Sequence, residues 1–188
     1  MDYPRGYVSY LKQLRAQGVT PDSRMAKFTS RYRFAGQLKN IELLGYSPAM
    51  TEIYLVVLRL CLAYSAFEQL EALVNRRNLP IKDPNLSMIF RSSKLTSFRK
   101  FLIDESRGLK KPLDKFVNSP NDSDLNSVVR ALRHSMFHGN LTATRAGITN
   151  RHVFAFIDQL EKLVFKAMDD EFHKFLSSKK TPHSDLVN

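Results

Sequence analysis

The sequence has little of what builds cross-linked or membrane-spanning proteins. Its single cysteine, Cys61, cannot form a disulfide within the chain and stands among apolar residues, so we expect a small core residue. The most apolar run, residues 53–67, is interrupted by Arg59 and is shorter than the roughly 20 residues of a transmembrane helix. The polar residues 1–5 lack a signal peptide's apolar region. We therefore expect a cytoplasmic protein with no membrane partner.

Patterns typical of β-structure and of phosphate-binding loops are also absent. No stretch alternates polar and apolar residues with the period of two that marks a half-buried strand. The sequence contains no glycine-rich phosphate loop and no internal repeat. Apolar residues instead recur at three- and four-residue steps, which predicts an all-α helical bundle.

Acidic residues are in the minority. The 188 residues include 18 Asp and Glu against 29 Lys and Arg, a formal net charge of +11, and the basic residues are spread along the chain. Such a charge favours polyanionic partners, so nucleic acid is the leading class of partner. The charge does not distinguish a protein that cuts nucleic acid from one that holds it.

The chain is long enough for one domain with a substantial core, which we expect to span residues 1–178, followed by a flexible tail at 179–188. Short helices are predicted at 7–17 and 24–44. A long central helix is predicted at 49–78, because apolar residues surround nearly its whole circumference. A long C-terminal helix is predicted from residue 149 or 150 to about 176.

Residues 79–121 form a predicted insertion of loops and short helices, with helical pieces at 87–92, 94–104 and 109–117. The insertion is basic, and its Lys and Arg residues include Arg91, Lys94, Arg99, Lys100, Arg107, Lys110 and Lys111. In a nucleic-acid enzyme such a surface would grip the substrate. In another kind of protein it would be a solvated decoration of the bundle, and the sequence fits both interpretations.

Two arginines and two histidines lie close together near the end of another predicted helix. The polar residues are Arg130, Arg133, His134 and His138. Apolar residues at helical steps predict a stripe that faces the core, formed by Leu125, Val128, Val129, Leu132 and Met136. At about 100° per residue, Arg130, His134 and His138 fall within roughly 80° of one another, away from that stripe. We therefore predict an active site at this helix end.

The motif at this helix end resembles a known one. Arg133, the polar His134, three further residues and His138, followed by Gly139, resemble the RxxxxH motif of the HEPN superfamily. Members are all-α domains, and many are metal-independent endoribonucleases that dimerise and occur in toxin–antitoxin and anti-phage systems. The resemblance implies an RNA substrate, a homodimer and no metal or other cofactor. It also implies that His138 is the acid–base residue and Arg133 the phosphate-stabilising one, with His134 beside them as a catalytic candidate.

The residue types agree with that chemistry. Cleavage of RNA without a metal needs a base for the ribose 2′-hydroxyl, an acid for the leaving 5′-oxygen and positive charge on the phosphate. Imidazole exchanges protons near neutral pH, and guanidinium matches phosphate oxygens with a planar fork of donors. Arg133 and His138 are about 140° apart on an ideal helix. In the family's dimer the motif helices of two subunits pair across a two-fold axis. Each phosphate could then contact Arg133 and His138 from different chains despite this separation.

Three further residues are supporting candidates. Arg130 shares the polar face of the motif helix, and Asn140 follows the motif. In one HEPN subgroup a tyrosine at the position of Asn140 is modified by a partner nucleotidyltransferase, so we expect no such modification here. Glu68 lies with Glu71 on a polar stripe of the central helix. One of these acids reaches the arginine and histidines, or both are solvated and pair with residues such as Arg76.

Two other classes of function remain. A non-catalytic HEPN-like module that binds nucleic acid or nucleotides would keep the arginines and need no reactive histidine. A metal hydrolase could use His134 and His138, which are four residues apart as zinc ligands on helices can be. The glutamate of an HExxH motif is missing, however, and no third ligand is evident in the sequence. The sequence does not identify the RNA, nor any cognate antitoxin or nucleotidyltransferase.

Overall fold

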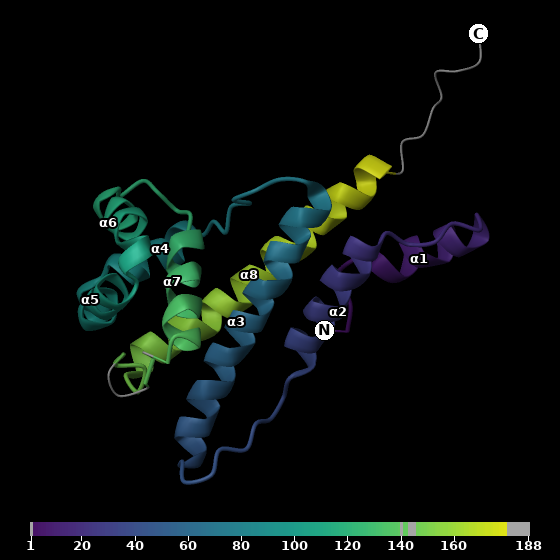
Figure 1. Cartoon of the computed structure of the whole chain (residues 1–188). Helices are drawn as coiled ribbons and strands as arrows, with labels where there is room; N and C mark the ends of the chain where they lie inside the picture. Colours follow the sequence, from purple (N-terminus) through teal and green to yellow (C-terminus); the bar gives the residue numbers. More distant parts are fainter. Residues whose placement is uncertain (1, 140, 143–145, 180–188) are drawn as a thin grey trace.

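A computed structural model of the protein describes residues 2–139, 141–142 and 146–179. These residues form eight α-helices and two short 3₁₀ helices and contain no β-strand, which confirms the predicted all-α class. The two long helices are α3 (Pro48–Val74) and α8 (Arg151–Lys179), and they pack side by side along the middle of the molecule (Figure 1). The final helix extends through Lys179, three residues beyond its predicted end.

The core lies around α3. This helix packs against α8, against α2 (Ser23–Gln37) and against α7 (Asn126–Phe137), and its Leu60, Phe67 and Leu70 are fully buried. Contact on several sides explains why its sequence is apolar around most of its circumference. The prediction of a long helix at the centre of the bundle therefore corresponds to α3.

Aromatic side chains join the N-terminal helices to α8. On α2, the Phe28 ring lies 5.1 Å from that of Phe172, and the Tyr32 ring lies 5.1 Å from that of Phe165. The helix α1 (Tyr7–Ala16) adds Tyr7, whose ring centroid is 6.3 Å from that of Phe172. Pairs of this kind contribute about 0.5–1.5 kcal/mol beyond the burial of their area. They hold α1 and α2 on the C-terminal half of α8.

The helix α2 is shorter than predicted. It ends at Gln37 and not near residue 44, and Leu38 is extended (φ −68°, ψ 102°). The segment from 38 to 47 runs alongside α3 to reach the start of that helix at Pro48 (Figure 1). An extended chain covers about 3.3 Å per residue against 1.5 Å in a helix, so this connection reaches farther than a helix of the same number of residues would. Leu44, the last residue of the predicted helix, is 89% exposed.

The ends of α3 follow local rules. Ser47 caps the first turn by accepting a hydrogen bond from the Met50 N–H (3.3 Å), and Pro48 opens the helix. The last helical residue is Val74, four residues before the predicted end. Asn75 then adopts a left-handed conformation (φ 53°, ψ 40°), which ends the helix.

The predicted basic insertion is a cluster of short helices at one side of the bundle (Figure 1). Its elements are α4 (Pro84–Arg91), η1 (Ser93–Leu95), α5 (Thr96–Glu105), η2 (Arg107–Leu109) and α6 (Lys110–Asn118). The Phe90 ring lies at its centre, within 6.4 Å of the rings of Phe98, Phe116 and Phe156. Because Phe156 belongs to α8, these contacts make the insertion part of the main core.

Two of the insertion's arginines bind backbone carbonyls within the fold. Arg91 donates to the carbonyl oxygens of Phe116 (2.9 Å), Ser119 (2.9 Å) and Asp122 (2.6 Å). Arg99 donates to the carbonyls that precede and follow Arg91, at 2.6 and 2.7 Å. These contacts bring charged donors to carbonyls at the ends of α4 and α6 and in the turns that follow them, and some of these carbonyls also accept a backbone N–H. Arg91 and Arg99 therefore support the fold and are not a substrate-gripping surface.

A buried ion pair connects the two long helices. Arg59 of α3 lies 2.6 Å from the Glu161 carboxylate of α8, whose side chain is only 3% exposed. Burial raises the pKa of Glu161, and the nearby Arg59 charge opposes that rise. Removing one partner of such a pair leaves an uncompensated charge, so Arg59 and Glu161 depend on each other.

By length and composition, α3 is long and apolar enough to cross a membrane, with a mean hydropathy of 1.5 over an 18-residue window. Within the protein, 44% of that window is buried, where α3 meets α2, α7 and α8. A core helix of a soluble protein has the same length and composition. This property therefore does not assign α3 to a membrane.

The Arg91 contacts generate a stability prediction. Arg91→Gln should lower the free energy of unfolding by about 2–3 kcal/mol, because a hydrogen bond to a charged group typically contributes about 1.5–3 kcal/mol. The matched control Lys94→Gln changes an exposed residue of the same insertion and should shift stability by less than about 0.5 kcal/mol. Urea unfolding followed by circular dichroism measures both. Equal effects of the two substitutions would count against a structural role for Arg91.

Candidate active site

The helix α7 ends where the sequence predicts. Phe137 is its last helical residue, His138 is the C-cap, and the His138 N–H donates to the His134 carbonyl at 3.0 Å. Gly139 then takes a positive φ of 70°, and its N–H donates to the Met136 carbonyl at 3.2 Å. Only a residue that tolerates the left-handed region can turn the chain here. The turn leaves the His138 side chain exposed at the helix end.

The predicted core stripe of α7 is confirmed. Leu125 at the N-cap of α7 and Val128, Val129 and Leu132 within it are fully buried, and Met136 is partly buried. The apolar pattern of the sequence does not indicate a second set of buried contacts. Ser106, between α5 and η2, donates to the Ala131 carbonyl (3.3 Å) and lies 3.4 Å from the Ser135 hydroxyl. The insertion thus holds the back of the motif helix.

The opposite side of α7 borders a surface depression of about 370 Å³. It is lined by α7 residues Arg130, Arg133, His134, Phe137 and His138, by Tyr64 and Glu68 of α3, and by Gly108 and Leu109 of η2. All three predicted catalytic residues and two of the three supporting ones therefore meet at one place. The third supporting candidate, Asn140, lies outside the described residues.

The two histidines are in ring contact. The His134 and His138 ring centroids are 4.2 Å apart, with an angle of 48° between the planes. The i, i+4 spacing on a helix end produces this contact, because such side chains lie one above the other. Two imidazoles that share one depression can take up and release protons on the same bound group.

Arg133 is oriented by an acid of α3. Its Nη1 lies 2.5 Å from Glu68 Oε1, and the two side chains are 32% and 38% exposed. The guanidinium also lies 5.9 Å from the centre of the Tyr64 ring and 5.8 Å from that of Phe137. An ion pair this exposed contributes at most about 1 kcal/mol to stability. Its main effect is to limit the directions in which Arg133 can point.

The two candidate acids of α3 have separate roles. Glu71 accepts a hydrogen bond from the Leu79 N–H at 2.8 Å, and burial raises its pKa. Arg76 pairs with Glu171 of α8 at 3.3 Å. Glu68 therefore reaches the motif, as one interpretation of the polar stripe expected. The other interpretation paired Glu68 and Glu71 with residues such as Arg76, but Arg76 pairs with Glu171 instead.

The angular separation of Arg133 and His138 does not keep them apart. Both line the same depression within one chain, and His138 does so from the C-cap of α7. Phe137, which is 62% exposed, lines the same depression at the end of α7. A second subunit is therefore not required to bring the two side chains to a common surface.

Tyr64 forms a rigid wall of the depression. It is buried, and its hydroxyl donates to Asn126 Oδ1 at 2.7 Å, while Asn126 Nδ2 donates to the Leu79 carbonyl at 2.9 Å. Burial raises the pKa of Tyr64, so the phenol stays protonated at neutral pH. Tyr64 therefore serves packing and hydrogen bonding.

The remaining reactive groups can be placed as well. Cys61 is buried as predicted, and burial raises the pKa of its thiol to about 12, which keeps it from acting as a nucleophile. Among the described residues, no group of three or more His, Cys, Asp or Glu is placed to hold a metal ion. His134 and His138 thus have no third ligand in this part of the chain.

We compared the chain with known protein families, curated proteins and solved structures. No protein-family model matches the chain, and no similar protein was found among curated sequences or solved structures.

The contact between Tyr64 and Asn126 leads to a second stability prediction. Tyr64→Phe should lower the free energy of unfolding by about 1–3 kcal/mol, because the buried Asn126 oxygen would lose its donor. Tyr46→Phe is the matched control, since Tyr46 is 52% exposed, and it should change stability by less than about 0.5 kcal/mol. Guanidinium chloride unfolding measures both, and a Tyr64 variant as stable as the control would refute the role of this bond.

Proposed function

We propose that the chain is a metal-independent endoribonuclease in an HEPN-like all-α domain, cleaving RNA through attack of a ribose 2′-hydroxyl. The observation that carries the proposal is the single depression lined by Arg133, His134 and His138. It supports the resemblance of these residues to the RxxxxH motif. An adjoining guanidinium and two imidazoles are the groups that such a reaction needs.

In this mechanism the imidazoles transfer the protons. A neutral imidazole takes the proton of the 2′-hydroxyl, the 2′-oxygen attacks phosphorus, and the bond from phosphorus to the 5′-oxygen breaks. An imidazolium gives its proton to the leaving 5′-oxygen. By resemblance to the motif, His138 is the principal acid–base residue. It is exposed at the helix end, and His134, in ring contact with it, is its partner.

Arg133 stabilises the phosphate as it gains negative charge. A guanidinium has five N–H donors, so the contact of Nη1 with Glu68 leaves donors for phosphate oxygens. Holding the side chain in advance lowers the reorganisation needed in the transition state. Arg130, which lines the same depression, adds a second positive charge. Glu68 and Arg130 are thus the supporting residues.

The net charge of +11 favours RNA as the partner through contacts with its phosphates. We further propose a cytoplasmic homodimer that acts as a toxin or anti-phage effector, regulated by a cognate antitoxin or nucleotidyltransferase. This biological setting rests on the resemblance alone.

A second candidate function is a non-catalytic HEPN-like module that binds nucleic acid or nucleotides. The close contact of Arg133 with Glu68 favours it, because the carboxylate offsets part of the charge that a reacting phosphate would need. Intact RNA bound without turnover would support this candidate over the nuclease.

The nuclease proposal predicts the effect of substitutions at the motif. His138→Ala and Arg133→Ala should each lower RNA cleavage by about 10²–10⁴-fold, the usual contribution of an acid–base group, and His138→Ala should retain more RNA binding. His173→Ala changes an exposed histidine of α8 outside the depression and should leave cleavage unchanged. Single-turnover assays with labelled RNA measure the rates, and circular dichroism checks that each variant folds.

The products of the reaction provide an independent check. They should carry 2′,3′-cyclic phosphate and 5′-hydroxyl ends, 2′-deoxy substitution at the cleaved position should stop the reaction, and EDTA should have little effect. Undiminished cleavage by His138→Ala, or cleavage that needs added Mg²⁺ and leaves 5′-phosphates, would rule out this mechanism.

The proposed dimer has its own test. Phe137 is a large apolar side chain that is 62% exposed beside the candidate site, and a two-fold contact between motif helices would cover it. Sedimentation velocity at tens of micromolar should give twice the mass of the chain. A monomer at that concentration would contradict the expectation.

A further inference from the structure

A second and larger depression of about 840 Å³ adjoins the candidate active site. The two depressions share Tyr64, Glu68 and Arg130, so they form one continuous surface. Ligand sites usually measure about 300–1,000 Å³, and this depression lies within that range. We call it the arginine cleft, since its lining includes Arg24, Arg76, Arg77 and Arg130.

The lining of the arginine cleft carries more basic than acidic residues, and two of its arginines are already paired, Arg24 with Asp22 (2.9 Å) and Arg76 with Glu171 (3.3 Å). Its lining holds four arginines and two acids, Glu68 and Glu71. Glu68 is engaged by Arg133, and Glu71 accepts the Leu79 N–H. Neither acid pairs with Arg77 or Arg130, and no ion pair involves these two arginines among the described residues. Two guanidinium groups are therefore available for an anionic ligand.

The turn that carries Arg76 and Arg77 is held in an uncommon conformation. Asn75 and Asn78, the residues on either side of the arginine pair, both have positive φ angles, 53° and 57°. Asparagine tolerates this region better than most residues, but such positions are sparse outside glycine. Glu71 locks the turn twice, since its carbonyl accepts the Arg76 N–H at 3.0 Å and its carboxylate accepts the Leu79 N–H. The two arginines are thus presented from a fixed backbone.

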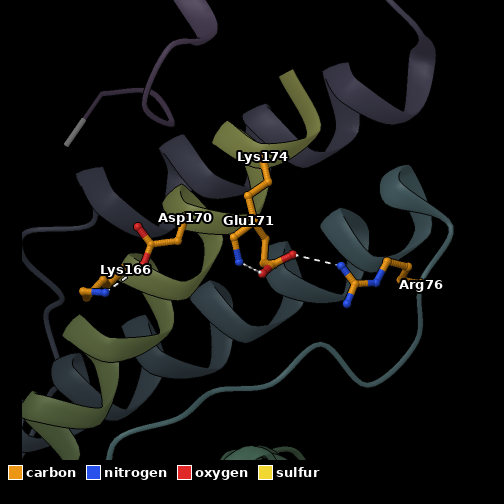
Figure 2. A network of polar contacts seen from close by, with 5 residues as sticks. All are labelled: Arg76, Lys166, Asp170, Glu171 and Lys174. Atoms are coloured by element: carbon orange, nitrogen blue, oxygen red, sulfur yellow. Dashed lines mark hydrogen bonds and ion pairs between the residues drawn. The ribbon is translucent and has the colours of Figure 1, made fainter. Parts of the chain in front are cut away.

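One of these arginines is also fixed through its side chain. Figure 2 shows Arg76 directed at Glu171 of α8, which also accepts a hydrogen bond from Lys174 at 2.6 Å. The neighbouring Lys166 and Asp170 form a separate pair at 2.7 Å. Arg76, itself 63% exposed, links the turn to α8, and the neighbouring Arg77 is also exposed and has no such ion pair among the described residues. A braced turn with an exposed guanidinium is suited to bind a ligand without first becoming ordered.

We propose that the arginine cleft binds the single-stranded RNA that flanks the cleaved phosphate, with Arg130 and Arg77 contacting successive phosphates. The inference rests on the proposed ribonuclease function and names the path of its substrate. Arg130 lines both depressions. In this proposal it therefore lies between the cleaved phosphate in the active-site depression and the flanking phosphate in the arginine cleft. Phosphate contacts by arginine carry no base preference of their own. The affinity of this cleft for RNA should therefore depend on the length of the RNA and not on its base sequence.

The test uses RNA oligonucleotides with 2′-O-methyl groups, which lack the attacking hydroxyl and so measure binding alone. Binding of the full chain to labelled oligonucleotides of about 2 to 12 nucleotides is followed by fluorescence anisotropy at several salt concentrations. Arg77→Gln should weaken binding of the longest oligonucleotide about tenfold. Its salt dependence should become shallower by roughly 0.7 in log–log slope, the value for one phosphate contact with a single strand. The loss should shrink as the oligonucleotide is shortened.

Two further variants control the measurement. Arg15→Gln removes the same charge from an exposed position on α1, outside the arginine cleft, and should leave the affinity within twofold of the wild type. Arg77→Lys keeps the charge and loses the planar fork, so it should recover part of the affinity. Thermal unfolding should show that all three variants fold like the wild type.

The outcomes separate the two proposals. If Arg77→Gln behaves like Arg15→Gln, or if the loss is equal at every length, the arginine cleft is not the RNA path, even when unmodified RNA is cleaved. If the length-dependent loss appears but unmodified RNA is not cleaved, the cleft stands as a binding site and the nuclease proposal fails.

Discussion

The packing of α7 on α3 is the contact on which the candidate site depends. At the start of α7, Asn126 joins Tyr64 of α3 to the Leu79 carbonyl, and about two turns later Arg133 meets Glu68. These polar contacts, about two turns apart along α7, fix the orientation of the helix about its own axis. In that setting the apolar stripe enters the core, and Arg130, His134 and His138 border a depression.

The insertion of short helices contacts α7 on the side away from the depression and helps to hold it in this orientation. Ser106 bonds the back of α7, and Arg91 closes the connection from α6 to α7 through three carbonyls. The arginines of this chain therefore have two roles, one in support of the fold and one at the exposed surface. Arg91 and Arg99 are directed at carbonyls of the fold, whereas Arg77 and Arg130 lie exposed along the arginine cleft. Net charge counts both kinds alike, so the charge of the insertion could not distinguish substrate binding from support of the fold.

Local patterns in the sequence determined the all-α class, the core stripe of α7 and the end of α7 at Gly139. Each depends on residues a few positions apart, whose spacing on a helix is set by its period and whose caps act within one turn. The same local pattern failed at α2, where helical spacing continues to Leu44 but the helix ends at Gln37. There the chain leaves the helix and runs alongside α3 to its start at Pro48 (Figure 1), and no short window of sequence contains the packing that sets this path.

Only the tertiary structure decided which side chains meet. Glu68 and Glu71 stand on the same polar stripe, yet one orients Arg133 and the other holds the turn before Leu79. Glu68 and Arg133 are 65 residues apart in the chain, and Arg91 is 31 residues from Asp122. Their partners depend on how helices rotate and cross, which buried contacts far along the chain determine. The sequence by itself therefore determined which chemical groups gather at the end of α7, and the packing of α3, α7 and the insertion decided how each one is held.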